Sequence, residues 1–136
     1  QLIIRGICCA VPGIKKLSEN IEIISIVDRF LEHARILVFH NGGNEEVYLS
    51  SADWMERNLS YRIETTFPVY DPDLKKEILE LMHLQLSDNV KARIIDRYHL
   101  NQYRRVASDI PIRSQIETYF RYKRLLDKTL AANAEK

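Results

Sequence analysis

Residues 30–62 read FLEHARILVFHNGGNEEVYLSSADWMERNLSYR, and this stretch decides the fold. Its uniformly apolar run 36–39 predicts a strand that is covered on both faces. Asparagine and glycine at 41–44 accept positive φ angles easily and predict a tight hairpin turn, after which the partner strand follows. The hairpin would bring His33, which precedes the first strand, close to the polar corner at 50–53. We expect the chemistry of the chain at this corner.

Strand patterns lie on both sides of the hairpin. The apolar run 2–11 predicts a buried strand that ends in a turn at Pro12-Gly13. Arg5 interrupts this run, and a guanidinium in a buried strand needs an anion, which is either a carboxylate in a structural ion pair or a phosphate. Residues 21–27 and 63–70 predict two further strands, the second at a sheet edge because it contains a proline.

Helix signals dominate the second half of the chain. Asp71 followed by Pro72 predicts an N-capped amphipathic helix that ends near residue 86. Residues 90–98 are ambiguous between a short strand and a helix, and we expect them to be weakly extended. A last helix is expected to begin at Asp109. Alternating strands and helices predict an α/β, or α+β layered, fold, and 136 residues with 46% hydrophobic content suffice for one domain, residues 1–136.

Composition excludes several classes of function. Twenty basic and 19 acidic residues give a net charge of +1, which gives no reason to expect nucleic-acid or anionic-membrane binding. The adjacent Cys8 and Cys9 predict buried, inert thiols and a reducing compartment. No apolar stretch approaches the roughly 20 residues of a membrane span, and no signal peptide is visible, so we expect a cytoplasmic protein. The chain starts without methionine inside a predicted strand, which suggests a piece of a longer protein.

Basic charge is concentrated late in the chain. Residues 91–128 carry ten lysines and arginines against four acidic residues, a difference of +6. This segment forms either a binding surface for a polyanion or a solvated helix face.

The polar residues of the chain suit phosphate chemistry. Arginines supply fixed positive charge, serine hydroxyls supply donors, and a histidine can attack phosphorus or move a proton. The candidate residues are His33, Arg5, Arg35, Arg57, Arg62, Ser50, Ser51 and Asp53. The four histidines show neither HExxH spacing nor paired cysteines, so no metal site is expected, and no GxSxG elbow supports a serine triad. We expect Trp54 and Met55 to pack beneath the polar corner.

Part of the chain resembles a half-site of the phospholipase D superfamily. His33-Ala34-Arg35, residues 50–53, Arg57-Asn58-Leu59 and Arg62-Ile63-Glu64 fall in the register of its HxK, GSxN and trailing motifs. Arginine stands where that family has lysine, and Asp53 stands where it has asparagine. A phosphodiesterase half-site, which would need a second copy to complete it, is therefore one alternative.

A longer resemblance is to the C-terminal domain of bacterial polyphosphate kinases of the phospholipase D-like type. The residues that carry it lie at 5–9, 12–13, 18–21, 25–33, 41–43, 50–55, 57–58, 71–72 and 90–93. It implies a phospholipase D-like half domain with a mixed sheet flanked by helices. It also implies reversible, ATP-dependent extension of polyphosphate through a phosphohistidine that lies in a preceding domain.

The resemblance also implies roles for individual residues. Arg5 and Arg62 would contact phosphates of ATP or polyphosphate, and His33 would be the second active-site histidine, as proton donor or charge stabiliser. Arg35, Ser50, Ser51, Asp53 and Arg57 are secondary candidates. The full-length enzyme would use Mg²⁺ held by residues outside this chain, assemble as a homo-oligomer, and reside in the cytoplasm, with peripheral membrane association as an option. The isolated chain would be inactive. The other alternative is a noncatalytic polyanion-binding module that uses the late basic segment.

Overall fold

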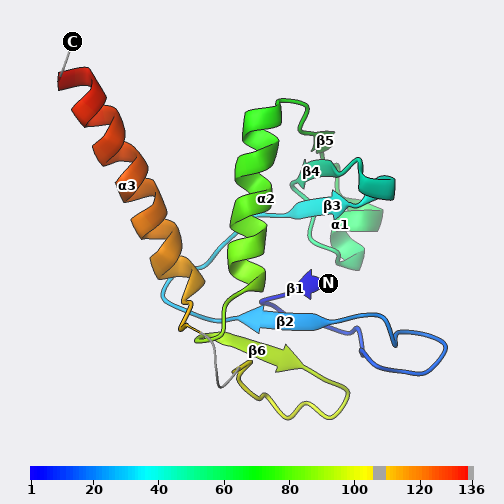
Figure 1. Cartoon of the computed structure of the whole chain (residues 1–136). Coiled ribbons are helices and arrows are strands. Elements are labelled where there is room, and N and C mark those ends of the chain that lie inside the picture. Colours follow the sequence, from blue (N-terminus) through cyan, green and yellow to red (C-terminus); the bar gives the residue numbers. More distant parts are fainter. Residues whose placement is uncertain (106–109, 135–136) are drawn as a thin grey trace. The chain divides into compact units, whose positions relative to one another are not determined.

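A computed structural model describes residues 1–105 and 110–134, which divide into two compact units. Unit 1 comprises Gln1–Leu31 and Leu81–Lys136, and unit 2 comprises Glu32–Glu80. Figure 1 shows the strands and helices of both. The prediction of a single domain stays a prediction.

Unit 1 is built on a three-stranded sheet in the order β1-β2-β6 (Figure 1). β1 (Leu2–Ile3) runs parallel to β2 (Ile23–Ile26), and β6 (Ala92–Ile95) runs antiparallel to β2. The sheet is mixed, as expected. Its core consists of Ile24, Ile26 and Ala92, against which Ile3 and Leu86 pack. The strand predicted at 21–27 and the extended segment at 90–98 are confirmed.

The buried strand predicted at 2–11 is wrong beyond its first residues. β1 has two residues, and Arg5 is exposed, so its charge needs no buried counterion. Further along, this segment is connected to the next loop, because the Ser18 hydroxyl donates to the Val11 carbonyl at 2.6 Å. Cys8 and Cys9 are free, as expected, but Cys8 is half-buried and Cys9 exposed rather than buried. The turn at Pro12-Gly13 is confirmed, with a φ of 77° at Gly13.

The helix predicted after Asp71 is confirmed as α2 (Pro72–Leu86). The Asp71 carboxylate accepts hydrogen bonds from the backbone N–H groups of Asp73 at 2.9 Å and Leu74 at 3.0 Å. These groups have no partner within the helix, which is why an N-terminal aspartate stabilises it.

Asp88, just after α2, joins three elements of unit 1. Its carboxylate is fully buried. Oδ1 accepts from the backbone N–H groups of Val90 (3.0 Å), Lys91 (2.6 Å) and Ala92 (3.0 Å), and Oδ2 accepts from the N–H and the hydroxyl of Ser114, both at 2.8 Å. Burial alone would raise the pKa of Asp88, but these donors outweigh it and lower the pKa below its ordinary value.

The last helix, α3 (Ser114–Ala134), begins later than predicted. Asp109, the expected start, lies outside the described residues. Two contacts fasten the start of α3 to the residues after β2. Arg113 donates to both carboxylate oxygens of Asp28, at 2.8 and 2.6 Å, and the Gln115 side chain exchanges two hydrogen bonds with the backbone of Phe30, at 3.0 and 2.9 Å.

Unit 2 contains a three-stranded antiparallel sheet in the order β3-β4-β5 (Figure 1). β3 (Ile36–Phe39) and β4 (Glu46–Ser50) form the predicted hairpin through η1 (Asn41–Gly43), where Gly42 and Gly43 have φ angles of 65° and 96°. β5 (Thr66–Pro68) is an edge strand, as its proline predicts. A short helix, α1 (Glu56–Tyr61), follows the polar corner and was not predicted.

Burial in unit 2 differs from expectation. Val38 and Phe39 are exposed, so β3 is not covered on both faces. Trp54 is 76% exposed and Met55 is exposed as well, so the expected packing beneath the corner is wrong. The α/β class is confirmed, with two small sheets rather than one. Within the described residues no helix is both long and apolar enough to cross a membrane.

Candidate phosphate-binding corner

The polar corner of unit 2 lies where the end of β4 meets the residues before β3. The backbone N–H of Ser50 donates to the Arg35 carbonyl at 2.9 Å. Residues 50–53 therefore lie beside Arg35, two residues after His33, as the hairpin register predicts.

Asp53 is the anionic centre of this corner. Its Oδ1 accepts a hydrogen bond from Nε of Arg35 at 2.9 Å, and its Oδ2 lies 4.0 Å from Nη2 of Arg57. A second nitrogen of Arg35, Nη1, donates to the His33 carbonyl at 3.0 Å. The guanidinium of Arg35 therefore contacts both Asp53 and the segment that carries His33.

The charge of His33 also acts on Asp53. The hydrogen bond from Arg35 lowers the pKa of Asp53 below its ordinary value, against the effect of partial desolvation, and the charges of Arg35, Arg57 and His33 act in the same direction. His33 itself is exposed. The exposure of His33 argues against the interpretation that it is a buried structural histidine. An exposed imidazole near arginines is accessible to an anionic ligand.

A second carboxylate, Glu64, lies in the corner. Asn58, which is 4% exposed, donates to Glu64 Oε1 at 2.7 Å, and the Ser51 hydroxyl donates to Oε2. The hydrogen bond from Ser51, then that from Asn58, lowers the pKa of Glu64, and the charges of Arg62 and Arg35 add to this effect. The positive charges of Arg62 and Arg35 therefore both act on Glu64.

The two serines are engaged in building the corner. The hydroxyls of Ser50 and Thr66 share a hydrogen bond at 2.8 Å, and Ser50 Oγ also accepts from the Ala52 N–H at 3.1 Å. Ser51 Oγ accepts from the Thr65 N–H at 3.1 Å. These hydrogen bonds connect the corner to the start of β5.

The structure thus groups most, but not all, of the predicted residues. His33, Arg35, Asp53 and Arg57 form one cluster, and Arg62 joins it through Glu64. Arg5 belongs to unit 1, and its convergence with His33 and Arg62 stays a prediction. Glu64 and Asn58 were not among the predicted site residues, although the Arg62-Ile63-Glu64 motif contains the signal that finds the glutamate.

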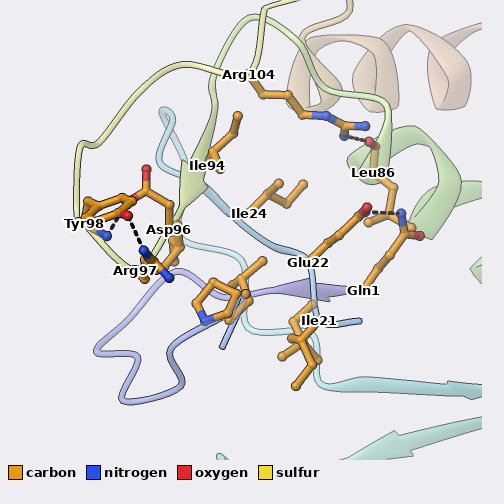
Figure 2. Close-up of a pocket in the computed structure, with 15 residues that line it drawn as sticks. Gln1, Ile21, Glu22, Ile24, Leu86, Ile94, Asp96, Arg97, Tyr98 and Arg104 are labelled. Atoms are coloured by element: carbon orange, nitrogen blue, oxygen red, sulfur yellow. Dashed lines mark hydrogen bonds between the residues drawn. The ribbon is translucent and has the colours of Figure 1, made fainter. Parts of the chain in front are cut away.

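A cavity of about 480 Å³ lies elsewhere, within unit 1 (Figure 2). Ile24, Ile94 and Leu86 line its apolar part, and Arg97 and Tyr98 lie at its rim. None of the predicted site residues lines it. Among the residues that the structure describes, no group of three or more histidine, cysteine or acidic side chains could hold a metal ion.

Known proteins resemble this chain over nearly its full length. The family described as polyphosphate kinase C-terminal domain 2 matches residues 1–115. The polyphosphate kinase of Vibrio cholerae is 49% identical over 135 residues, which are 99% of this chain and 19% of that protein. The polyphosphate kinase of Escherichia coli K12 is 47% identical over 119 residues, 88% of this chain and 17% of that protein.

A solved structure is also similar to the chain. The crystal structure of polyphosphate kinase from Porphyromonas gingivalis superposes with a TM-score of 0.86 at 50% identity, over 93% of this chain and 19% of that one. This confirms the fold expected from the resemblance. The chain spans less than a fifth of the length of each of these relatives. Since the family match covers residues 1–115, the chain belongs to the polyphosphate kinase C-terminal domain 2 family.

Proposed function

We propose that residues 1–136 are a piece of the C-terminal catalytic domain of a longer polyphosphate kinase, which transfers phosphoryl groups reversibly between ATP and polyphosphate. The family and the relatives support this proposal. The observation that carries it is the polar corner, in which Arg35 bonds to both Asp53 and the His33 carbonyl and the charge of Arg62 acts on Glu64.

The chemistry follows from charge. A transferring phosphoryl group spreads negative charge over its equatorial oxygens, which arginines can stabilise. In this proposal Arg62 and Arg5 bind those oxygens, while His33 donates a proton or stabilises charge on the reacting phosphate. Asp53 holds the guanidinium of Arg35 in place through their ion pair, and the charge of Arg62 acts on Glu64.

The rest of the reaction lies outside the chain. A histidine of a preceding domain would take the terminal phosphoryl group from ATP, release ADP, and pass the group to the end of the polyphosphate chain. Mg²⁺ would be held there as well, and it would balance charge on the phosphates of the nucleotide. We further propose that the complete enzyme is a cytoplasmic homo-oligomer whose partners are ATP, polyphosphate and its own remaining domains, with no role for nucleic acid. The isolated chain is then inactive.

A histidine substitution in the complete enzyme tests the proposal. We expect His33→Ala to lower the rate of ATP-linked polyphosphate synthesis by about 100-fold or more, which is typical for loss of a proton donor. His40→Ala is the matched control, because His40 is also exposed and lies at the other end of β3. It should leave the rate unchanged.

Two results would contradict the proposal. One is normal synthesis by His33→Ala with unchanged circular dichroism. The other is cleavage of a chromogenic phosphodiester by the 136-residue chain alone, which would instead indicate a self-completing phosphodiesterase half-site.

A further inference from the structure

The segment that follows β6 folds back and lies alongside it. β6 ends at Ile95, and the returning chain pairs with it: the Ile94 N–H donates to the Gln102 carbonyl at 2.8 Å, and the Arg104 N–H donates to the Ala92 carbonyl at 2.8 Å. We call residues 92–105 the arginine hairpin. It lies entirely within unit 1.

The arginine hairpin is strongly basic. It contains four arginines and one acidic residue, Asp96, a difference of +3. The Asp96 carboxylate is turned toward the backbone, where Oδ1 accepts from the N–H groups of Tyr98 at 2.7 Å and Leu100 at 3.4 Å. The acidic group closes the turn and pairs with none of the arginines.

Tyrosine rings hold three of these arginines. The guanidinium of Arg93 lies 4.1 Å from the centroid of the Tyr103 ring, and that of Arg105 lies 5.1 Å from the same centroid. The guanidinium of Arg97 lies 4.6 Å from the centroid of Tyr98 and donates to its hydroxyl (Figure 2). Cation–π contacts of this kind restrict a side chain without neutralising its charge.

The fourth arginine has a different task. Arg104 donates to the carbonyl of Leu86, the last residue of α2, and lines the cavity of unit 1 (Figure 2). Its guanidinium satisfies a carbonyl that the helix leaves without an internal partner. We therefore exclude it from the site proposed below.

Three arginines outside the hairpin are paired with carboxylates. Within residues 1–105 and 110–134 the three ion pairs use Arg35, Arg57 and Arg113. Arg113 belongs to the late basic segment that the sequence offers for polyanion binding, but both its Nε and its Nη2 bond to Asp28. The arginines of the hairpin, unlike Arg113, make no ion pair among the described residues, so their positive charge remains available.

We infer that Arg93, Arg97 and Arg105 form a noncatalytic binding site for the phosphates of a linear polyphosphate chain. Guanidiniums are well suited to phosphate because they present several N–H donors in one plane. RNA fits less well, because base recognition uses open aromatic faces, whereas here arginines lie over Tyr98 and Tyr103. The site goes beyond the proposed function, since it uses no residue of the phosphate-binding corner.

Removing two exposed arginines tests the site in the 136-residue chain. Arg97→Gln with Arg105→Gln removes two charges, while Arg93 is kept because its Nη1 holds the hairpin through the Asn101 carbonyl at 3.1 Å. We expect the dissociation constant for long-chain polyphosphate to rise about tenfold and the slope of log K against log[salt] to fall by about two. Fluorescence anisotropy over a range of salt concentrations measures both.

A control on another element removes the same charge. Lys123→Gln with Arg124→Gln alters two exposed residues of α3 in the same unit, and should leave the affinity unchanged. His40→Ala, which changes a histidine outside the phosphate-binding corner, should also bind polyphosphate normally. The hairpin test measures binding by the 136-residue chain and the His33→Ala test measures synthesis by the complete enzyme, so failure of the catalytic proposal and failure of this one are distinguishable.

Several outcomes would overturn the inference. Unchanged affinity in the hairpin variant removes these arginines from binding, and equal losses in the α3 variant indicate general charge attraction. If the hairpin variant loses as much affinity for tripolyphosphate or ATP as for long-chain polyphosphate, the hairpin is a triphosphate site instead. Tighter binding of single-stranded RNA of matched charge, lost in the same variant, would make it an RNA site.

Discussion

Arg35 Nε lies 2.9 Å from Asp53 Oδ1, and this ion pair ties the segment before β3 to the residues after β4. The two side chains are only about one-third exposed, at 31% and 38%. Through its second bond, to the His33 carbonyl, Arg35 also holds the histidine that we propose for catalysis. Formation of the corner and placement of His33 therefore depend on the same guanidinium.

Acid should weaken this corner in a defined direction. Arg35 holds the pKa of Asp53 below the value it has in the unfolded chain, so the ionised carboxylate stabilises the fold above about pH 4. That contribution is lost as the pH falls through the lowered pKa. We expect Asp53→Asn to flatten the fall in unfolding free energy below about pH 4, as measured by urea denaturation at several pH values.

A double substitution provides the control. In an Arg35→Met background the pKa of Asp53 loses its main cause of depression, so adding Asp53→Asn should change the pH profile little. An equal effect of Asp53→Asn with and without Arg35 would contradict the role of the ion pair.

Asp88 should be among the residues most important for stability. An amide keeps only one acceptor oxygen, so its NH₂ group must face either the three N–H groups that bind Oδ1 or the Ser114 N–H that binds Oδ2. In both orientations at least one buried N–H is left without an acceptor. We expect Asp88→Asn to lower the free energy of unfolding by about 3 kcal/mol. Asp127→Asn, on the exposed part of α3, is the control and should change it by less than about 0.5 kcal/mol. Similar values for the two variants would refute the joining role of Asp88.

The ion pair between Arg113 and Asp28 leads to a separate prediction about stability. The Asp28 side chain is 2% exposed, so Arg113→Met leaves a buried carboxylate without its partner. Because Arg113 is itself 33% exposed and partly screened by water, we expect a loss of about 2 kcal/mol in thermal or urea denaturation.

Two further variants check that explanation. Arg113→Lys should restore only part of the stability, since one ammonium cannot make both bonds of the guanidinium. Adding Asp28→Asn to Arg113→Met should also recover part of it. A double variant as unstable as the sum of the single ones would indicate that the two side chains act independently.

Local chemistry explains which elements the sequence could predict. The turn at 41–44 and the Asp71 cap each depend on residues within a few positions, and both are confirmed. The strand prediction for residues 2–11 was wrong because apolar character alone does not supply a hydrogen-bonded neighbour. Of these residues, only Leu2 and Ile3 pair with β2. α1 was missed because six residues are too few to show a helical repeat.

The contacts that stabilise unit 1 lay beyond any local pattern. Asp28 and Arg113 are 85 residues apart, and Asp88 and Ser114 are 26 apart. The corner could be predicted better, because the hairpin register alone brings Arg35 beside Ser50. Glu64 lies in the corner because Ser51 and Asn58 donate hydrogen bonds to its carboxylate, and the hairpin register predicts neither contact.

The central claim is that the corner binds the phosphates that react. It is tested most directly by a structure of the complete enzyme that we propose, with bound phosphate or an ATP analogue. We predict that His33, Arg62 and Arg5 each place a nitrogen at about 3 Å from oxygens of one anion. Anions bound elsewhere, with these three side chains in separate surroundings, would contradict the account.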